Sequence, residues 1–293
     1  MDKSSMRENR IHGNSMFPLM VYYSESPQGE NLFDCHWHNE MELLLITKGK
    51  VLIQIENAYC ELSEGQAAII GSGDIHAAFA IDHSPCSFKA IVFNQDILSS
   101  QSYDIMQEKY MEPLKRKIFH LPSYLKGEQS WEKDIINKFN EIFKIYSGKK
   151  LGYELSIKAL LYLILSDIFS NDGFSSRKER TPSEIYQSER LKSVLNYIHE
   201  NYSKKLTIKD MSQIVNMSEG HFCRFFKQMV RRTPIDYLNN YRMNEATKLL
   251  LEKDKKIFEV ALDVGFDNFS YFINIFKHYL NCTPSQYRNK TRN

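Results

Sequence analysis

Two stretches near the C-terminus of the chain, Phe222-Cys-Arg-Phe-Phe-Lys-Gln-Met-Val-Arg-Arg-Thr-Pro-Ile-Asp-Tyr237 and Phe272-Ile-Asn-Ile-Phe-Lys-His-Tyr-Leu-Asn-Cys-Thr-Pro-Ser-Gln-Tyr287, share one pattern. They align without a gap at an offset of 50, with Phe, Phe-Lys, Thr-Pro and Tyr in register. Unrelated helices rarely repeat so many positions, so we interpret the stretches as two copies of one supersecondary unit.

The first copy contains the start and stop signals of two short helices. Thr207 is expected to cap a helix over residues 208–215, and Asn216-Met217 to make a turn. Ser218 is expected to cap a second helix that runs to residue 229. The pattern predicts a helix-turn-helix unit at about 207–230.

The second copy predicts the same unit at about 257–280. A short helix covers residues 257–264, Gly265 supplies the turn, and Asn268 caps a helix that ends at residue 280. Between the units, Pro234 begins a long helix. Its expected core-facing stripe sets the spacing of the two units and consists of Ile235, Leu238, Tyr241, Leu249 and Leu250.

Charge is divided unevenly along the chain. The whole chain has a formal net charge of +2, but residues 186–293 hold 18 Lys/Arg against 11 Asp/Glu, a net of +7. Residues 1–185 are therefore acidic. A basic end on an acidic body indicates that the C-terminal part binds a polyanion, and its helix-turn-helix pattern indicates that this polyanion is double-stranded DNA.

In a helix-turn-helix unit, the second helix enters the major groove and its exposed residues contact base edges. The phenylalanines of the repeat must face the core, so other residues face the DNA. Arg224 suits guanine, Asn274 suits adenine, and Ile273 suits a thymine methyl group. The expected DNA-contacting residues are Ser218, Glu219, Gly220, Cys223, Arg224, Lys227 and Arg231 in the first unit, and Asn268, Ser270, Ile273, Asn274 and Lys277 in the second.

Residues 190–290 resemble the AraC family of transcription regulators. The resemblance rests on Ala246-x₂-Leu-Leu250, Ile257-x₂-Val-Ala261, Val-Gly-Phe266, Phe272-x₃-Phe-Lys277 and Thr-Pro284-x₂-Tyr-Arg288. It implies a sequence-specific regulator that responds to an effector, forms a homodimer and, as an activator, contacts RNA polymerase. The sequence departs from the family at Arg231 and Asn281, where the family usually has Gly.

Residues 1–125 have the short aliphatic runs and turns of a sandwich or barrel. The predicted strands are Glu42–Thr47, Lys50–Ile55, Gln66–Ile70 and Ser87–Phe93. Residues 126–170 then show two amphipathic helical patterns, a dimerisation element by our interpretation, and polar residues 171–188 are typical of a linker. The predicted fold is α+β with several domains: a β-barrel with two following helices, and an all-α domain over residues 189–293.

The barrel region contains a group of metal-binding residue types. In His36-Trp-His38-Asn-Glu-Met-Glu42, alternation places both histidines and Glu42 on one strand face, and a neighbouring strand can add His76. Three imidazoles and a carboxylate suit zinc, iron, manganese or nickel. A metal-free pocket that recognises hydroxyl groups has the same residue types.

This region resembles the two short motifs of the cupin barrel, over residues 29–93. The resemblance leaves three alternatives open. In the first, a small organic effector such as a sugar is bound by His36, Trp37, His38, Glu42 and His76. In the second, the three histidines and Glu42 bind a transition metal, either without a catalytic role or as a cupin-type enzyme fused to a DNA-binding module. In the third, the barrel only dimerises. Trp37 suits either core packing or stacking on a sugar. Our leading interpretation is a regulator that is not an enzyme and needs no cofactor.

Composition narrows the setting. The five cysteines are odd in number, scattered and never spaced C-x-x-C, which argues against a disulfide framework and a thiolate zinc site. The N-terminus has no signal-peptide pattern, and the longest apolar run, Ala159–Leu165, is too short to span a bilayer. We therefore expect a cytoplasmic protein with no membrane partner.

Overall fold

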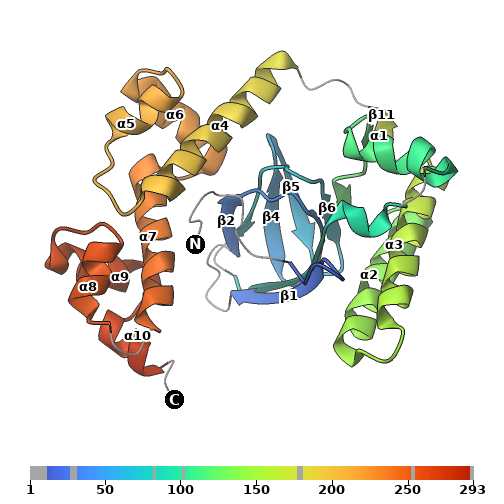
Figure 1. Cartoon of the computed structure of the whole chain (residues 1–293), viewed down its shortest axis with the longest axis horizontal. Helices are drawn as coiled ribbons and strands as arrows, with labels where there is room; N and C mark the ends of the chain where they lie inside the picture. The colour runs from blue at the N-terminus through green and yellow to red at the C-terminus, as the bar shows by residue number, and fades with distance from the viewer. Residues whose placement is uncertain are drawn as a thin grey trace. The chain divides into compact units, whose positions relative to one another are not determined.

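The computed structural model of the chain describes residues 12–26, 32–81, 84–100, 103–176, 181–251 and 255–290. These residues form two compact units, one within residues 7–185 and the other within residues 186–293. Figure 1 shows the sheets and helices of the first unit and the all-helical second unit. The two units are described separately below.

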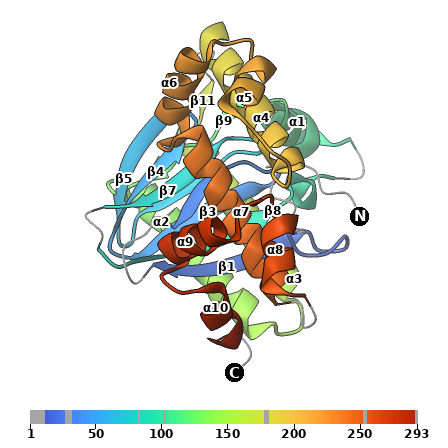
Figure 2. The same ribbon diagram turned by 90° about the vertical axis from the view of Figure 1, so that its left-hand side faces the viewer.

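The first unit is built on two antiparallel sheets. One sheet has the strand order β1-β8-β3-β6-β10, the other has the order β2-β7-β4-β5, and β9 pairs with β11 separately. Strands β4, β5 and β7 lie side by side in Figure 2. The strands are β1 (Leu19–Ser26), β2 (Phe33–His36), β3 (Met41–Lys48), β4 (Lys50–Ile55), β5 (Ala58–Ser63), β6 (Ala67–Ile70), β7 (His76–Ala80), β8 (Cys86–Phe93), β9 (Phe119–His120), β10 (Tyr124–Leu125) and β11 (Ser175–Ser176).

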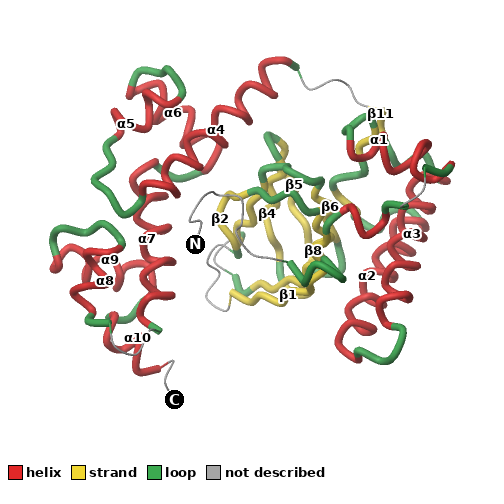
Figure 3. The backbone as a smooth tube through the Cα atoms, viewed as in Figure 1, coloured by secondary structure: helices red, strands yellow, loops and turns green. Residues whose placement is uncertain are grey.

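The helices of the first unit follow the strand region and pack on one sheet. Helices α2 and α3 lie side by side next to the sheets in Figure 3. They share a core with Leu43 of β3 and Ile91 of β8, so the five-stranded sheet is covered by helices on one face. The helical elements are η1 (Gln95–Leu98), η2 (Gln107–Met111), α1 (Glu112–Lys115), α2 (Ser130–Gly148) and α3 (Tyr153–Ser170).

Strand β3 shows how the sheet serves two cores. Met41 and Leu43 join the core against α2 and α3, whereas Leu44 and Ile46 join the core between the two sheets. Burial on both faces explains why this strand is a continuous aliphatic run. Because side chains alternate along a strand, Glu42 belongs to the second set and points into the space between the sheets.

In the residues that the structure describes between Pro182 and Lys290, the second unit has seven helices. The phenylalanines of the repeat, Phe222, Phe226, Phe272 and Phe276, are fully buried, as the sequence predicts. Helix α7 contacts α6, α8 and α9 and so connects the two helix-turn-helix units. The helices are α4 (Pro182–Asn201), α5 (Ile208–Ile214), α6 (Glu219–Val230), α7 (Pro234–Leu250), α8 (Ile257–Asp263), α9 (Phe269–Leu280) and α10 (Pro284–Lys290).

The structure confirms the predicted fold class and corrects several local predictions. Residues 95–115 hold helical turns, although the β-rich pattern extended over them. Residues 182–188 of the predicted linker are the first turns of α4, which begins at a proline, and residues 175–176 pair with β9. Ile235 is exposed rather than part of the α7 stripe, because Tyr237 occupies the core beside Leu238.

No helix among the residues described by the structure is long and apolar enough to cross a membrane.

Candidate functional site

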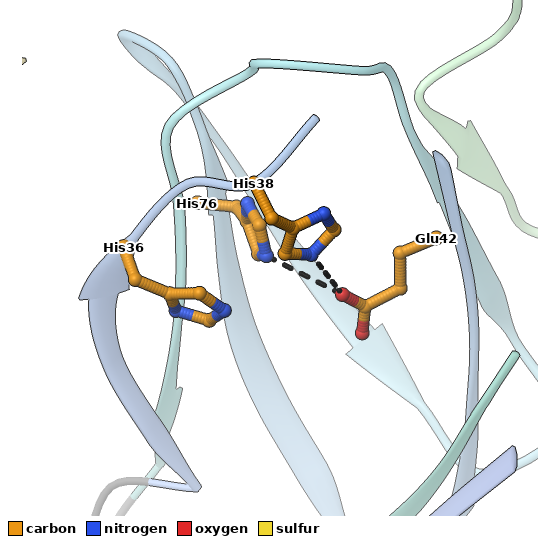
Figure 4. A group of neighbouring side chains, drawn as sticks. All are labelled: His36, His38, Glu42 and His76. Atoms are coloured by element: carbon orange, nitrogen blue, oxygen red, sulfur yellow. Dashed lines mark hydrogen bonds and ion pairs between the residues drawn. The ribbon is translucent and has the colours of Figure 1, made fainter. Parts of the chain in front are cut away.

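Four side chains from different parts of the chain converge between the sheets. Each of His36, His38, Glu42 and His76 offers a ligand atom, and these atoms all lie within 4.8 Å of one another (Figure 4). The distance from His38 Nε2 to Glu42 Oε2 is 3.2 Å, and the distance from His76 Nε2 to the same oxygen is 3.3 Å. Glu42 and His76 are buried, as is His38. We call these four residues the histidine cluster.

The structure brings together the four residues that the sequence grouped, but it places His38 and Glu42 differently from the prediction. His36 ends β2, and the chain bends at Asn39 and Glu40 before β3 begins. His38 therefore lies in a connection, and Glu42 lies on a strand of the other sheet rather than farther along the same strand face. His76 lies opposite His36 in the β2–β7 pair, as expected for a neighbouring strand.

Each imidazole of the cluster is oriented by the backbone. The Nδ1 atoms of His36, His38 and His76 donate hydrogen bonds to main-chain carbonyl oxygens. A carbonyl oxygen only accepts, so Nδ1 carries the proton and the Nε2 of a neutral ring offers a lone pair. Metal-binding histidines are commonly fixed in this way. The accepting carbonyls belong to Asp34, Glu40 and Asp74, at 2.8, 3.1 and 2.8 Å.

The cluster holds an ionised carboxylate beside a neutral imidazole. Burial by itself raises the pKa of Glu42, but the rings of His38 and His76, which can donate to its carboxylate from Nε2 when they are protonated, outweigh burial and hold that pKa well below its ordinary value. Burial, followed by repulsion from His76 and His38, lowers the pKa of His36 well below its ordinary value. At neutral pH, Glu42 is therefore negative and His36 is neutral.

One further histidine lies beside the cluster. The ring centroid of His12 is 5.5 Å from that of His38, and His12 Nδ1 lies 2.8 Å from the hydroxyl of Tyr22. His12 is buried, but its place in the sequence matches neither short motif, so no spacing rule could find it. Trp37, which lies between His36 and His38 in the sequence, is partly buried. Its contact with an effector stays a prediction.

The turn that leads to His76 connects the cluster to the rest of the first unit. Gly73 N donates to His38 O at 2.7 Å, and Ser72 Oγ donates to Asn39 O at 2.6 Å. The carboxylate of Asp74 pairs with Lys117 Nζ at 3.0 Å. This turn also lines a cavity of about 370 Å³, together with Lys115, Lys117 and His120.

The second unit presents the predicted DNA-contacting residues on its surface. Ten of the twelve residues are exposed on α6, α9 or their ends, whereas Cys223 and Ile273 are partly exposed. Thr207 and Asn268 cap their helices through the side chain, as expected. Ser218 occupies the N-cap of α6 with extended backbone, but its side chain makes no cap hydrogen bond, contrary to the prediction.

Two arginines of the basic unit are structural. Arg242 of α7 donates to the carbonyls of Tyr202 and Lys204, both at 2.8 Å. Arg288 of α10 donates to the carbonyls of Leu250 and Lys255 at 3.1 and 2.7 Å. Arg242 therefore holds the segment that precedes α5, and Arg288 holds the segment that precedes α8. Part of the positive charge counted in the sequence therefore supports the fold.

The two units match two known domain families. Residues 17–165 match the AraC-like ligand binding domain, and residues 211–290 match a helix-turn-helix domain. The HTH-type transcriptional regulator YdeC of Bacillus subtilis is 32% identical over 287 residues, which are 97% of this chain and 96% of YdeC. The chain belongs to the AraC family. It is a DNA-binding transcription regulator of that family.

The chain is also similar to a second curated regulator and to a solved domain. The melibiose operon regulatory protein of Escherichia coli is 23% identical over 264 residues, which are 86% of this chain and 82% of that protein. Among solved structures, the C-terminal domain of the response regulator yesN from Fusobacterium nucleatum is 38% identical, with a TM-score of 0.32. That match covers 32% of this AraC-family chain and 93% of the yesN domain.

Proposed function

We propose that this AraC-family regulator responds to a divalent transition metal bound by the histidine cluster. The observation that carries the proposal is the convergence of three oriented imidazoles on one buried carboxylate. A neutral imidazole and a carboxylate are both electron-pair donors, so a cation at their common centre stabilises both. Such a set of N and O ligands suits zinc, iron, manganese or nickel.

The distances within the cluster support a metal ion. Two ligands on one tetrahedral ion lie roughly 3.3 Å apart when their bonds are about 2.0–2.1 Å long. The separations of 3.2 and 3.3 Å from Glu42 Oε2 to the Nε2 atoms of His38 and His76 match this value. All four ligand atoms lie within 4.8 Å of one another, so they can converge on a single ion.

The residues around the cluster support a route by which binding is sensed. A bound metal supplies a positive charge that draws β2, β3 and β7 together. Asp74 O accepts from His76, the Asp74 carboxylate binds Lys117, and β9 two residues later pairs with β11 near the start of the linker. We propose that this path, from His76 through Asp74 and Lys117 to β11, transmits the metal signal toward the DNA-binding unit.

Metal content is the direct test of this proposal. The full chain, dialysed against each divalent ion alone, is expected to retain about one zinc, iron, manganese or nickel ion per chain by elemental analysis. His36→Ala and His76→Ala should lose that ion, whereas His278→Ala, which removes an exposed imidazole on α9, should keep it. Wild-type protein without metal, or His76→Ala protein with it, contradicts the proposal.

For DNA, we propose that α6 and α9 each enter a major groove with the twelve residues named above. Their exposure and the basic charge of the unit support this arrangement. Because the partner is DNA and relatives are named transcriptional regulators, we propose that the metal acts as a signal and not as a catalytic centre. We also propose that the protein acts in the cytoplasm. As an activator, the chain would also contact RNA polymerase.

We also propose a homodimer formed through α3. Leu155, Ala159 and Leu163 are exposed at spacings of four residues, while the opposite face of α3 packs against α2. Such a stripe is self-complementary when a second copy approaches about a two-fold axis. Sedimentation of a Leu155→Glu, Leu163→Glu double variant should show a monomer where wild-type shows a dimer. A wild-type monomer with operator DNA bound contradicts the proposal.

A further inference from the structure

The second recognition helix begins with exposed aromatic side chains. Phe269, the first residue of α9, is 37% exposed, and Phe258 of α8 is 52% exposed. Ile273, one turn farther along α9, is partly exposed on the same helix. The first unit differs, because the offset of 50 places Glu219 where the second unit has Phe269.

The ring of Phe269 is held in position from two sides. Phe258 meets it edge to face, with ring centroids 5.6 Å apart and planes at 65°. The fully buried Phe272 stacks on it, with centroids 6.2 Å apart and planes at 20°. A ring supported in this way presents a rigid apolar surface, which loses little side-chain entropy when it meets a partner.

The neighbours of Phe269 face the proposed DNA surface. Ser270 and Asn274 are exposed on the same two turns of α9, and Lys277 follows one turn later. The apolar surface is therefore continuous with the groove-facing residues rather than separate from them. In the major groove, the apolar group that a base pair offers is the C5-methyl of thymine.

We propose that Phe269 reads a thymine methyl group in the half-site of α9, with Phe258 as the positioning residue that holds its ring. Ile273 reads a second methyl group about one helical turn farther along α9. The inference rests on the proposed entry of α9 into a major groove, and it assigns the base preference of that half-site. The α9 half-site thus contains one or two thymines that are read through their methyl groups, whereas the α6 half-site is read by Arg224 and other polar groups.

Thymine-to-deoxyuridine substitution tests this assignment, because it removes only the C5-methyl group. Duplexes are first selected from a random pool with the full chain and footprinted, and each thymine is then replaced singly. Burial of one methyl group corresponds to roughly a four-fold change in affinity. We expect a loss of about that size at one or two thymines in the α9 half-site and none in the α6 half-site.

Variants connect the effect to particular residues. Phe269→Ala should bind thymine and deoxyuridine duplexes equally at one position, and Phe269→Leu, which keeps an apolar surface, should retain part of the preference. Phe258→Ala should weaken the same preference, and Gln213→Ala, at an exposed residue of α5 outside the proposed groove contacts, should leave it unchanged. Equal affinity of all variants for non-specific DNA at low salt shows that the unit is folded.

The outcomes separate this inference from the proposed function. A footprint over both half-sites with no deoxyuridine effect overturns the inference and leaves the proposed groove contacts intact; Phe269 and Phe258 then face a protein instead. Discrimination that survives in Phe269→Ala also overturns it. No footprint over the α9 half-site contradicts the proposed function itself.

Discussion

Arg231 and Asn281 stand at equivalent positions after the two recognition helices, and both have left-handed backbone, with φ of 60° and 52°. This conformation is unfavourable by about 1–2 kcal/mol for residues with a Cβ atom, and Asn tolerates it better than Arg. The sequence departs from the family's usual Gly at both positions, and the structure shows the same backbone turn at both exits. The turn is therefore kept even where its residue is unfavourable.

We expect Arg231→Gly to raise the free energy of unfolding of the full chain's DNA-binding unit by about 1 kcal/mol, since glycine adopts positive φ without a Cβ clash. Asn281→Gly is the matched control and should have a smaller effect. Urea unfolding followed by helical circular dichroism measures both changes. A loss of stability at Arg231, or equal gains at both positions, would contradict this explanation.

Arg224 and Lys277 provide a second contrast at this scale. Both are exposed on recognition helices. Arg224→Ala should weaken specific binding by about 1–3 kcal/mol and relax the preference at one base pair, because a guanidinium bonds two guanine acceptors. Lys277→Ala should weaken binding to all sequences and lower the salt slope by about 1, because we propose that Lys277 contacts phosphate. Binding curves on selected and scrambled duplexes distinguish the two; identical behaviour of both variants argues against these roles.

Single residues of the candidate sites were predictable where spacing carries the information. His36, His38, Glu42 and His76 follow two short motifs, so the sequence could group them. His12 could not be found, because only tertiary packing brings it to His38. The apolar pair of Phe258 and Phe269 was equally hidden, since no periodicity relates residues on two different short helices.

Among the elements, the aliphatic strands and the capped helices were the predictable ones. Helices α5, α6, α8 and α9 agree with their expected bounds within one residue, because cap residues and positive-φ turns mark their ends. Strand β1 was not predicted, because it ends in polar residues, and β7 was expected only as a neighbouring strand that carries His76, without bounds. The bend between β2 and β3 contains no glycine or proline, so the sequence did not indicate a turn there.

The segment from Asp74 to β9 is the element that should transmit the metal signal. Lys117→Met removes the partner of Asp74 while it keeps the length of the side chain. We expect this variant to bind metal as wild-type does, yet to show no change of operator affinity on metal addition. Arg116→Met is the matched control, because Arg116 is exposed and pairs with Glu112 instead. Loss of metal binding in Lys117→Met, or a normal response, would contradict the proposed route.

At the scale of the whole molecule, the chain combines a β-sheet unit with a basic helical unit, and sequence reasoning could predict this division. Composition and charge change along the chain, and the 50-residue repeat occurs only in its C-terminal part, so the sequence distinguishes the two units. The packing of α2 and α3 on the five-stranded sheet could not be predicted from the sequence, because amphipathic helices can cover a sheet or pair with a second copy. Only the packed structure shows which face each helix buries.

The most direct test of a metal-responsive regulator is the operator affinity of the full chain with and without its metal. A duplex selected by the chain is titrated by fluorescence anisotropy, with wild-type and Glu42→Gln compared after stripping and after addition of one equivalent of the retained ion. Coupling free energies of this kind change affinity about 5- to 150-fold. We predict a change of about ten-fold or more in wild-type and none in Glu42→Gln. Equal operator affinity of metal-loaded and metal-stripped wild-type protein would contradict the account.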